Sequence, residues 1–473
     1  MFPLLPTPIA QIAPATTPLP STLTTPTPLL PKGYIQQTHE IRELPGKLNE
    51  VLVFNSNSPE VVQSDGILLS TFPPSGKLYA SAHLDRSFSK RFDLFTHHIA
   101  RPIDGRTIYQ GVIVYNPNSE TVKLDVLQAV SYLTNPDAPF IDLPPQVENP
   151  YGRVYSGPGS RLTQDILRGV NQLGFPSQIL IPPNQSRMLL NLPIANGTAR
   201  STYMRLHSDR PVYMANLAMQ PPSGRLPELA QWEELLRIGR LATPRDRIPT
   251  EPDKIEATLK ARLRKIYGRV AGVAQGSEWQ GEITDPPNGK SLTIPQRGQA
   301  LSYPLSSVIL GTLNTGQVQS APMVVRYPDT AYRAHGNYGV RYNLTIPLEN
   351  NTKQAQTVIL AIQTPLKHER GKNVLWFYEP PGQVFFRGTV QVSFKDDRGV
   401  PQKRYFHLVQ RQGEQGQPLM TLNMPPGDRR LVGVSFLYPP DATPPQALTI
   451  RTLESSSQLS ANRSVNWRSN PIR

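Results

Sequence analysis

Proline is the feature that most restricts how this chain can fold. The sequence has 473 residues and 51 prolines, roughly twice the average usage of about 5%. Proline lacks a backbone N–H and clashes with the preceding helical turn, so it disrupts helices and central strands but suits turns, edge strands and linkers. We therefore set aside a helical bundle and expect a chain made mainly of strands and turns.

The two ends differ from the rest of the chain. Residues 1–31 contain nine prolines and no charged residue, which is typical of an extended, polyproline-like stalk. The same segment also fits an atypical or truncated signal peptide, because it lacks a basic opening region. Residues 454–473 are rich in serine, and we expect a disordered tail there. No apolar run reaches the roughly 18 residues that a membrane-spanning helix needs, so the sequence predicts none.

Two segments far apart in the chain predict the same succession of a strand, a turn and a strand. Between residues 110 and 133, apolar and polar residues alternate on either side of a turn that begins at Asn116. A period of two is typical of a strand with one buried face. The pattern recurs between residues 341 and 365 around Asn350, with two more residues in the loop. Matching the two asparagines aligns the apolar positions, which are Val112, Val114, Val122, Leu124 and Val126 in the first segment and Ile346, Leu348, Val358, Leu360 and Ile362 in the second.

A proline corner is the second shared landmark. Pro182-Pro183-Asn184 matches Pro425-Pro426-Gly427, and asparagine and glycine are the residues that best tolerate the positive φ of a type II turn. When Arg187 and Arg430 are aligned after the corners, the next apolar residues fall on opposite faces. A one-residue bulge in one copy would restore the match. We infer an internal duplication, while the competing interpretation is that such turns recur by chance in a proline-rich β-protein.

These landmarks predict the fold class and the domain organisation. We expect a mainly β protein with two immunoglobulin-like antiparallel β-sandwich domains joined by a short helical segment. The expected sandwiches cover residues 32–222 and 269–453, and the helical linker covers residues 223–268. Residues 201–218 are expected to form two strands around a turn at Ser208-Asp209-Arg210-Pro211.

The linker holds the predicted helices. One is expected over residues 226–239, and a second is expected to open at a capping box beginning at Thr250 and to end near Gly268. The polar face of the second helix supplies basic candidate binding residues, which are Lys260, Arg262, Arg264 and Lys265. This face suits an acidic partner or a lipid surface. The simpler interpretation is a solvated face of a helix that packs on the sheets.

Composition limits the chemistry that the chain can perform. The formal net charge is +14, spread along the sequence, which suits a soluble basic surface or attraction to an anionic envelope polymer, glycan or lipid headgroup. Nucleic-acid binding would rest on net charge alone and is the weakest of these alternatives. The chain has no cysteine, so disulfides, thiol nucleophiles and Cys-ligated metals are excluded.

The densest polar cluster lies between His83 and His98. Asp93 and His97 are four residues apart and would share one face of a helix. Weak candidates for metal ligands are Asp85, Asp93, His97 and His98. A metal needs three or four converging ligands, so a segment of internally satisfied polar groups is the simpler interpretation, and we predict no cofactor.

A second polar cluster runs from Tyr327 to Tyr338, just before the second of these two strand–turn–strand segments. Its tyrosines suit stacking on a sugar, or they cover the end of a sheet. The candidate binding residues are Tyr327, Tyr332, Arg333, His335 and Tyr338. The sequence contains no phosphate-binding loop, no His-Glu-x-x-His zinc motif and no Gly-x-Ser-x-Gly elbow. We therefore assign no catalytic residue.

Four stretches resemble a known family, namely Arg91–Ile99, Pro136–Pro145, Gln319–Gly339 and Leu422–Val432. The family consists of uncharacterised cyanobacterial proteins and is known chiefly as a conserved domain of unknown function. The resemblance covers most of the chain after the stalk. It implies an exported protein, because family members usually begin with a signal peptide, and this chain departs from them there. It implies no activity and no catalytic residues.

Together these features predict a non-catalytic, extracytoplasmic protein, periplasmic or extracellular, with a binding or scaffolding role at the cell envelope. The first alternative is a carbohydrate-active enzyme or a sugar-binding protein with a site near His83–His98 or Tyr327–Tyr338. A nucleic-acid-binding protein is a weaker alternative. The identity of the ligand and the oligomeric state stay open at this stage.

Overall fold

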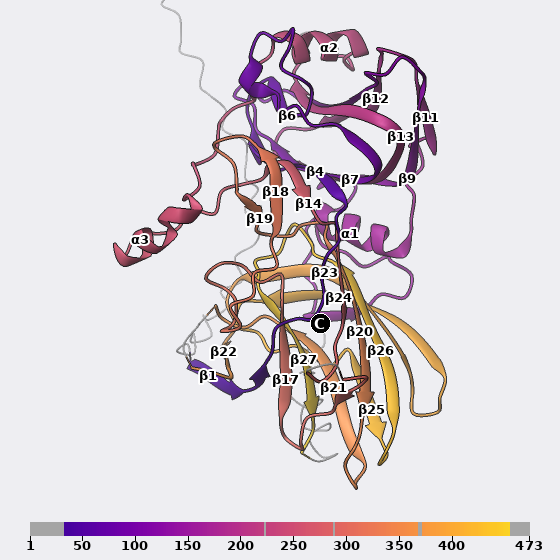
Figure 1. The fold of residues 1–473 in the computed structure, drawn as a ribbon, viewed down its shortest axis with the longest axis vertical. Helices are drawn as coiled ribbons and strands as arrows, with labels where there is room; N and C mark the ends of the chain where they lie inside the picture. Colours follow the sequence, from indigo (N-terminus) through magenta and orange to yellow (C-terminus); the bar gives the residue numbers. More distant parts are fainter. Residues whose placement is uncertain (1–32, 222–223, 287–288, 368–370, 455–473) are drawn as a thin grey trace, which may run out of the picture.

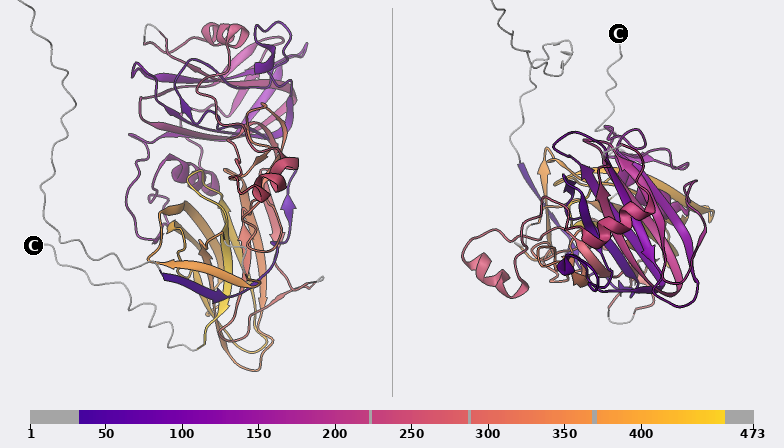
Figure 2. Two further views of the ribbon diagram at one scale, coloured as in Figure 1. Left: turned by 90° about the vertical axis from the view of Figure 1, so that its left-hand side faces the viewer. Right: turned by 90° about the horizontal axis from the view of Figure 1, so that it is seen from above.

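The computed structural model describes residues 33–221, 224–286, 289–367 and 371–454. The predictions for the stalk and for residues 455–473 lie outside these residues. The chain is mainly β, with 46% strand, 8% helix and several sheets. This confirms the predicted fold class at that level. Two modules lie one above the other in Figure 1, and Figure 2 shows the same stacking from the side.

The N-terminal module is the upper one in Figure 1 and is built on a 12-stranded sheet system. Its strands are β4 (Leu52–Ser56), β5 (Val61–Val62), β6 (Gly66–Ser70), β7 (Phe88–Ala100), β8 (Ile108–Tyr115), β9 (Val122–Leu133), β11 (Gln178–Ile181), β12 (Ser186–Ile194), β13 (Ala199–Met219), β14 (Ala271–Gln275), β18 (Ala321–Arg326) and β19 (Arg333–Ala334). Strand β13 pairs β7 and β9 through its first half and β6 and β8 through its second half. Buried side chains such as Phe92, Val112 and Leu206 join these strands in one core.

The C-terminal module contains an eight-stranded, a five-stranded and a two-stranded sheet. The eight strands are β3 (Lys47–Leu48), β10 (Gln146–Glu148), β15 (Glu278–Glu282), β16 (Leu292–Thr293), β20 (Arg341–Glu349), β23 (Val384–Lys395), β24 (Pro401–Arg411) and β26 (Arg429–Leu437). The others are β2 (Glu40–Ile41), β17 (Ala300–Leu305), β21 (Gln356–Gln363), β25 (Met420–Met424) and β27 (Gln446–Thr452), with β1 (Gly33–Thr38) paired to β22 (Val374–Glu379). The two larger sheets share a core in which Ile346 and Leu360 are fully buried.

The sheets of each module recruit strands from both halves of the chain. Strands β1, β2, β3 and β10 pair in the C-terminal module. In the sequence, however, β1, β2 and β3 come before the strands of the N-terminal module, and β10 lies between two of them. Strands β14, β18 and β19 extend the N-terminal sheet system, although they follow the helical linker. The boundaries at residues 222 and 268 stay predictions, and these strand pairings cross them in both directions.

Helix α1 (Pro158–Arg168) lies between the modules in Figure 1, and the sequence analysis missed it. Proline suits its first turn, and Gly169 ends it in the left-handed region at φ 77°. On one side, the Tyr132 hydroxyl of β9 donates to the Asp165 carboxylate over 2.6 Å. On the other side, the Thr389 hydroxyl of β23 donates to Gln164 over 2.9 Å. The helix therefore ties the two modules together through buried hydrogen bonds.

The helical linker is only partly as predicted. Helix α2 (Leu229–Ile238) confirms the first helix and buries Trp232 and Leu236. The second prediction is wrong beyond Lys260, where α3 (Ile255–Lys260) ends, and neither α3 nor the short 3-10 turn before it (Pro252–Lys254) has a side-chain cap. The apolar side chains of the predicted helix do not pack into a core, since Leu263 is 63% exposed. A short helix without tertiary packing has little stability of its own.

Residues 250–266, called the arm below, instead leave the body and return to it. The Thr250 N–H donates to the Ile266 carbonyl, and the Ile266 N–H donates to the Thr250 hydroxyl, both over 2.9 Å. Thr250 thus closes the base of the arm rather than capping a helix. Figure 1 and the right-hand view of Figure 2 show α3 projecting from the body.

The two predicted strand–turn–strand segments are confirmed as β8–β9 and β20–β21, and their asparagines make the same contacts. The two strands of each segment do not pair with each other: β8 pairs with β12 and β13 and β9 with β11 and β13, whereas β20 and β21 belong to different sheets. The Asn116 side-chain amide donates to the carbonyls of Glu120, Ile181 and Pro182. The Asn350 amide donates to the carbonyls of its own counterparts, Gln354, Met424 and Pro425. Each amide therefore fixes the turn between its two strands against the proline corner of its own module.

The proline corners also correspond in geometry. Asn184 and Gly427 both have positive φ, 52° and 74°. The Gln185 and Asp428 N–H groups close the turns on the carbonyls of the first prolines. The strand register shifts between Met188 and Leu190 of β12, which is the bulge that the alignment required. The sheet orders β11-β9-β13-β7 and β25-β21-β27-β17 are likewise equivalent.

One strand prediction needs correction. Residues 201–218 do not form two strands around a turn but lie within the single strand β13, whose register shifts between Ser208 and Val212. The Ser208 hydroxyl donates to the Arg210 carbonyl across this irregularity, and the Asp209 carboxylate accepts from the Lys123 N–H. Local side-chain bonds therefore bend the strand from one layer to the other instead of ending it.

Candidate functional site

A cleft of about 550 Å³ opens where the two modules meet. This volume lies within the roughly 300–1,000 Å³ of small-molecule sites, which favour the junctions of domains. The end of β4, strand β7, the return of the arm, the segment after β19 and the β26–β27 loop all reach it. Its polar lining residues are Asn55, Asn57, Glu60, His97, Arg264, Tyr267, Arg269, His335, Asn337, Tyr338, Lys367 and Asp441.

The cleft brings together residues that the sequence analysis placed in three separate candidate segments. His97 comes from the first polar cluster, Arg264 from the basic linker, and His335 and Tyr338 from the tyrosine-rich loop. The sequence predicted these three segments as separate candidate sites. No pattern in the sequence related them to one another.

Four buried side-chain atoms of cleft residues have no hydrogen-bond partner among the described residues. They are the side-chain oxygens of Asn55 and Asn57, the Asp441 Oδ2 atom and the His335 Nδ1 atom. Asn57 is only 8% exposed, and its N–H is already bonded to the Val270 carbonyl over 2.8 Å. A buried acceptor without a donor costs about 1–3 kcal/mol, so these atoms favour a ligand that carries O–H or N–H groups. Asn55 also borders a second, small cavity of about 10 Å³.

His335 is neutral at physiological pH. Burial lowers the pKa of its imidazole to about 3, and the charges of Lys265 and Arg333 add to this effect. Its ring packs edge-on against Tyr267, with ring centres 4.9 Å apart. A neutral imidazole offers one lone pair, so His335 can accept a hydrogen bond from a ligand but does not attract an anion.

The two carboxylates of the cleft differ in their surroundings. Glu60 is ion-paired with Arg269, which also reaches Asp246 over 2.9 Å. Burial raises the pKa of Asp441, and its Oδ2 atom turns toward the first turn of α1, where a Cβ on Gly159 would lie 2.8 Å from it. Glu60 is therefore neutralised by a partner, while the Asp441 Oδ2 atom has no hydrogen-bond partner among the described residues.

Two cations of the cleft lack a carboxylate partner among the residues that the structure describes. They are Arg264, at the return of the arm, and Lys367, which follows β21. Burial lowers the pKa of the Lys367 ammonium. Three cations, Arg264, Arg269 and Lys367, line the cleft against two carboxylates, Glu60 and Asp441, so the lining has an excess of one positive charge.

His97 does not form a nucleophilic pair, although its Nδ1 atom lies 2.7 Å from the Ser201 hydroxyl. Ser201 is fully buried within β13 and does not line the cleft. A serine nucleophile must reach its substrate, so this pair is a cross-strand contact that orients the imidazole.

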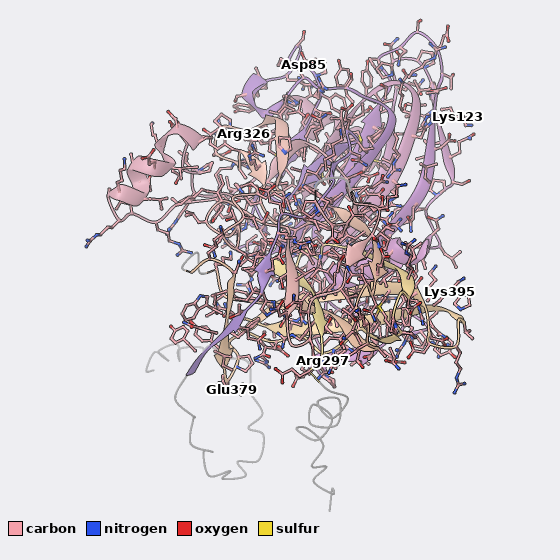
Figure 3. The ribbon with its side chains drawn as sticks, turned by 60° about the horizontal axis from the view of Figure 1, so that its bottom comes forward. Asp85, Lys123, Arg297, Arg326, Glu379 and Lys395 are labelled. Atoms are coloured by element: carbon pink, nitrogen blue, oxygen red, sulfur yellow. The ribbon has the colours of Figure 1, made fainter. Side chains whose placement is uncertain are left out.

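The weak metal candidates do not converge. Asp93 is buried and bonded to Tyr203 and Arg91, whereas Asp85 is exposed at the periphery of the N-terminal module, as Figure 3 shows. His98 lies on the opposite face of β7 from His97 and is held by the Pro59 carbonyl. The spacing that suggested a shared helical face belongs to a strand. Within the described ranges, no three His, Asp or Glu side chains are grouped to hold a metal.

Only part of the tyrosine-rich loop is accessible to a ligand. Tyr327 is fully buried in the N-terminal core and donates to the Ala82 carbonyl, so it cannot stack on a sugar. The Arg326 guanidinium lies 3.6 Å from the ring centre of Tyr332, and Arg333 donates to the Ser320 carbonyl outside the cleft. Of the predicted loop residues, His335 and Tyr338 alone line the cleft.

The basic candidate residues of the linker also lie in different surroundings. Lys260 is paired with Glu256 on the arm, and Arg262 is exposed there. Lys265 is buried, contrary to the prediction, with its ammonium 3.5 Å from the ring centre of Tyr267. Burial lowers the pKa of Lys265 to about 8. The basic face therefore does not exist as one surface, since the helix that would carry it ends at Lys260.

The sequence did not single out eight polar residues of the cleft, namely Asn55, Asn57, Glu60, Tyr267, Arg269, Asn337, Lys367 and Asp441. Asn55 lies within β4, and the others lie between strands, where loops commonly carry functional side chains. The polar run Asn55–Ser58, which begins inside β4, was a usable signal for Asn55 and Asn57. Nothing in the sequence related that run to Asp441, almost four hundred residues later.

Comparison with protein families gives a family but no activity. Residues 39–452 match the family described as "Protein of unknown function (DUF3370)". The chain belongs to that family. The DUF3370 match includes both modules and every cleft residue named above, and it confirms the resemblance to a conserved domain of unknown function. No curated protein matches the chain. None of the described helices has the length and apolar character needed to cross a membrane.

Solved structures add only distant likenesses to this DUF3370 protein. The 11S allergen from Cocos nucifera L. is 10% identical, with 81% of this chain and 95% of that chain covered and a TM-score of 0.11. Pumpkin seed globulin is 8% identical, with 84% and 86% covered and a TM-score of 0.12. Procruciferin, an 11S globulin from Brassica napus, is 9% identical, with 87% and 85% covered and a TM-score of 0.10. Scores this low carry no argument about fold or function.

Proposed function

We propose that this protein is a non-catalytic binding protein that works outside the cytoplasm, at the cell envelope, and that its ligand occupies the cleft between the modules. The observation that carries the proposal is the pair of unpartnered acceptors, Asn57 and His335, buried in a cleft of about 550 Å³. Buried polar groups are normally hydrogen-bonded, so a ligand that donates to both would complete the site.

Other observations support the proposed location outside the cytoplasm. Residues 1–31 have the proline-rich, uncharged composition of a stalk or signal remnant, and the resemblance to uncharacterised cyanobacterial proteins implies export. An anionic envelope polymer, a glycan or a lipid headgroup would suit the net charge of +14. Fractionation of the native host with antibody detection tests the location. Recovery from the periplasm or the medium is expected, and recovery from the cytosol alone would overturn it.

A sedimentation experiment tests the binding role. The full chain is mixed with purified peptidoglycan and with envelope polysaccharide, and the bound fraction is measured for the wild type, Asn57→Leu and His335→Leu. We expect the wild type to co-sediment with one of the polymers and each variant to bind about tenfold more weakly, since each loses an acceptor at the centre of the site. Equal retention of the variants, with unchanged unfolding midpoints, would remove the cleft from the proposal.

A carbohydrate-active enzyme is the second candidate, and Asp441 is the observation that favours it. A carboxyl group with a raised pKa beside a second carboxylate is the arrangement that glycoside hydrolysis uses, and Asp441 and Glu60 both line the cleft. The ion pair of Glu60 with Arg269 makes binding the better supported of the two. New reducing ends released from a polysaccharide by the wild type, and not by Asp441→Asn, would establish the enzyme instead.

We also propose that the modules are immunoglobulin-like sandwiches that arose by duplication. The matching hydrogen bonds of Asn116 and Asn350, the two proline corners and the bulge in β12 support this origin. Independent evolution would need to arrive at the same turn, the same buried amide and the same order of strands. An alignment of each module from many homologues tests it, because a duplication predicts sequence similarity between the modules beyond these landmarks.

A further inference from the structure

We propose that the cleft binds an acidic saccharide, which is a hydroxyl-rich ligand bearing a carboxylate or sulfate group. This inference rests on the binding function proposed above and names the chemical class of its ligand. It combines two observations that the binding proposal leaves separate, namely the unpartnered acceptors and the uncompensated cations of one cleft.

The acceptors define the hydroxyl-rich part of the ligand. Asn57 and His335 come from two different segments that line the cleft, the loop after β4 and the segment after β19. In the neutral tautomer that is protonated at Nε2, the His335 Nδ1 atom accepts a hydrogen bond. Two separate acceptors need two donors on one ligand, and the hydroxyl groups on a sugar ring supply them.

The cations define the acidic part. Arg264 and Lys367 line the same cleft and have no ion-pair partner within the part of the chain that the structure describes. A guanidinium group can hold a carboxylate or sulfate through two parallel hydrogen bonds, and an ammonium group adds a point charge. A neutral sugar would leave both cations uncompensated, so the cleft favours a sugar that carries an anion.

The aromatic rings argue against a nucleotide, which would also be a hydroxyl-rich anion. A nucleobase needs an open ring face on which to stack. One face of the Tyr267 ring is covered by the Lys265 ammonium at 3.5 Å, and the Tyr338 ring is packed against Gly336 with its hydroxyl bonded to the Ala442 carbonyl. Apolar lining is limited to small side chains such as Val308 and Ala334, which gives no path for a lipid tail.

Titration calorimetry on the full chain tests the class. The probes are tetragalacturonate for the uronates, a heparin tetrasaccharide for the sulfated sugars, and maltotetraose as a neutral sugar of equal length. We expect one of the two acidic probes to bind and maltotetraose to bind at least about tenfold more weakly. Which acidic probe binds more tightly distinguishes a uronate from a sulfated sugar as the natural source.

Variants matched in charge locate the effect. Arg264→Gln with Lys367→Gln removes the two cations of the cleft, and Arg297→Gln with Lys395→Gln removes an equal charge from exposed sites at the periphery that Figure 3 labels. The cleft pair should weaken binding of the acidic probe by about tenfold or more, and the peripheral pair by less than about twofold. None of the four residues belongs to the buried core, so both double variants should fold.

Each outcome has one meaning. If all three probes bind alike, the cleft binds saccharides without selecting charge, and the inference fails while the binding function stands. If both double variants weaken the acidic probe equally, the attraction is to the net charge of the protein and the inference fails. If no probe binds and Asn57→Leu still lowers retention on envelope polymers, the ligand belongs to another class. If that retention is unchanged as well, the proposed function fails too.

Discussion

The side-chain amides of Asn116 and Asn350 occupy equivalent positions in the two modules, each donating to three backbone carbonyls. Both asparagines are fully buried. Their oxygens accept from the N–H groups two residues later, of Asn118 and Thr352. Each amide thus donates hydrogen bonds to carbonyls of the turn and of the proline corner that would otherwise be buried without a donor.

Replacing either asparagine should therefore destabilise its module. Asn116→Ala and Asn350→Ala each leave buried carbonyls without a donor, and we expect each to lower the free energy of unfolding by about 2–4 kcal/mol. Asn351→Ala, which alters an exposed neighbour, should change it by less than about 0.5 kcal/mol. Urea unfolding measures all three. A loss at one asparagine only would show that the two corners are not energetically equivalent.

The bulge in β12 predicts an unusual tolerance to deletion. Removing Leu189, the extra residue between Met188 and Leu190, should leave Leu190 opposite Val112, as Val432 lies opposite Ile346 in the other module. The cost should be about that of one buried leucine, roughly 2–4 kcal/mol.

Deleting Gly433 from β26 is the matched control, because β26 pairs with β20 without a bulge. That deletion turns Val434 and Phe436 away from the core, since a slip of one residue reverses the faces of a strand. We expect it to cost more than the removal of Leu189 and to prevent folding. Equal stability of the two deletion variants, measured by thermal unfolding, would show that the bulge does not set the register.

Close packing of α2 on β8 depends on a glycine. A Cβ at Gly111 would lie 2.6 Å from the ring of Trp232, which is fully buried. Gly111→Ala should therefore cost about 1–3 kcal/mol through overpacking. Adding Trp232→Leu should cost less in this background than in the wild type, because the smaller side chain relieves the contact. Strict additivity in the double-mutant cycle would contradict the direct contact.

Stability should fall as the solution becomes acidic, because several histidines are buried in neutral form. Burial lowers the pKa of His39, His98 and His335 to about 3, and of His83 and His407 to about 4. Between an unfolded pKa near 6.5 and these values the unfolded chain binds more protons, so the free energy of unfolding decreases as pH falls. Each histidine contributes up to about 1.4 kcal/mol per pH unit in that window.

Urea unfolding between pH 7 and pH 5.5 measures this effect. The carboxyls of Asp65, Asp165, Glu414 and Asp441 have pKa values raised by burial and act in the opposite direction, at pH values above their ordinary ones near 4. His98→Asn should reduce the slope by about one proton. A free energy of unfolding that stays flat over this range would show that the histidines protonate in the folded protein.

The sequence by itself determined the local structure of this protein. Alternation with a period of two located the strands on either side of Asn116 and Asn350, because a half-buried strand needs it. Turn chemistry identified the corners at Pro182 and Pro425, since positive φ admits few residue types. The apolar positions also called for a bulge in one of the two copies, and the structure places it in β12. These features depend on neighbours along the chain, and so the chain alone records them.

Tertiary structure decided which segments meet. Asn57, His335 and Asp441 come from loops that no sequence period connects, and they form one cleft because the two modules stack on α1. Helix α1 was missed because its stability comes from side chains it contacts in both modules, and the second linker helix ended early because Leu259 and Leu263 found no core. Burial, pairing and the pKa values that follow from them depend on contacts across hundreds of residues, and local pattern does not encode those contacts.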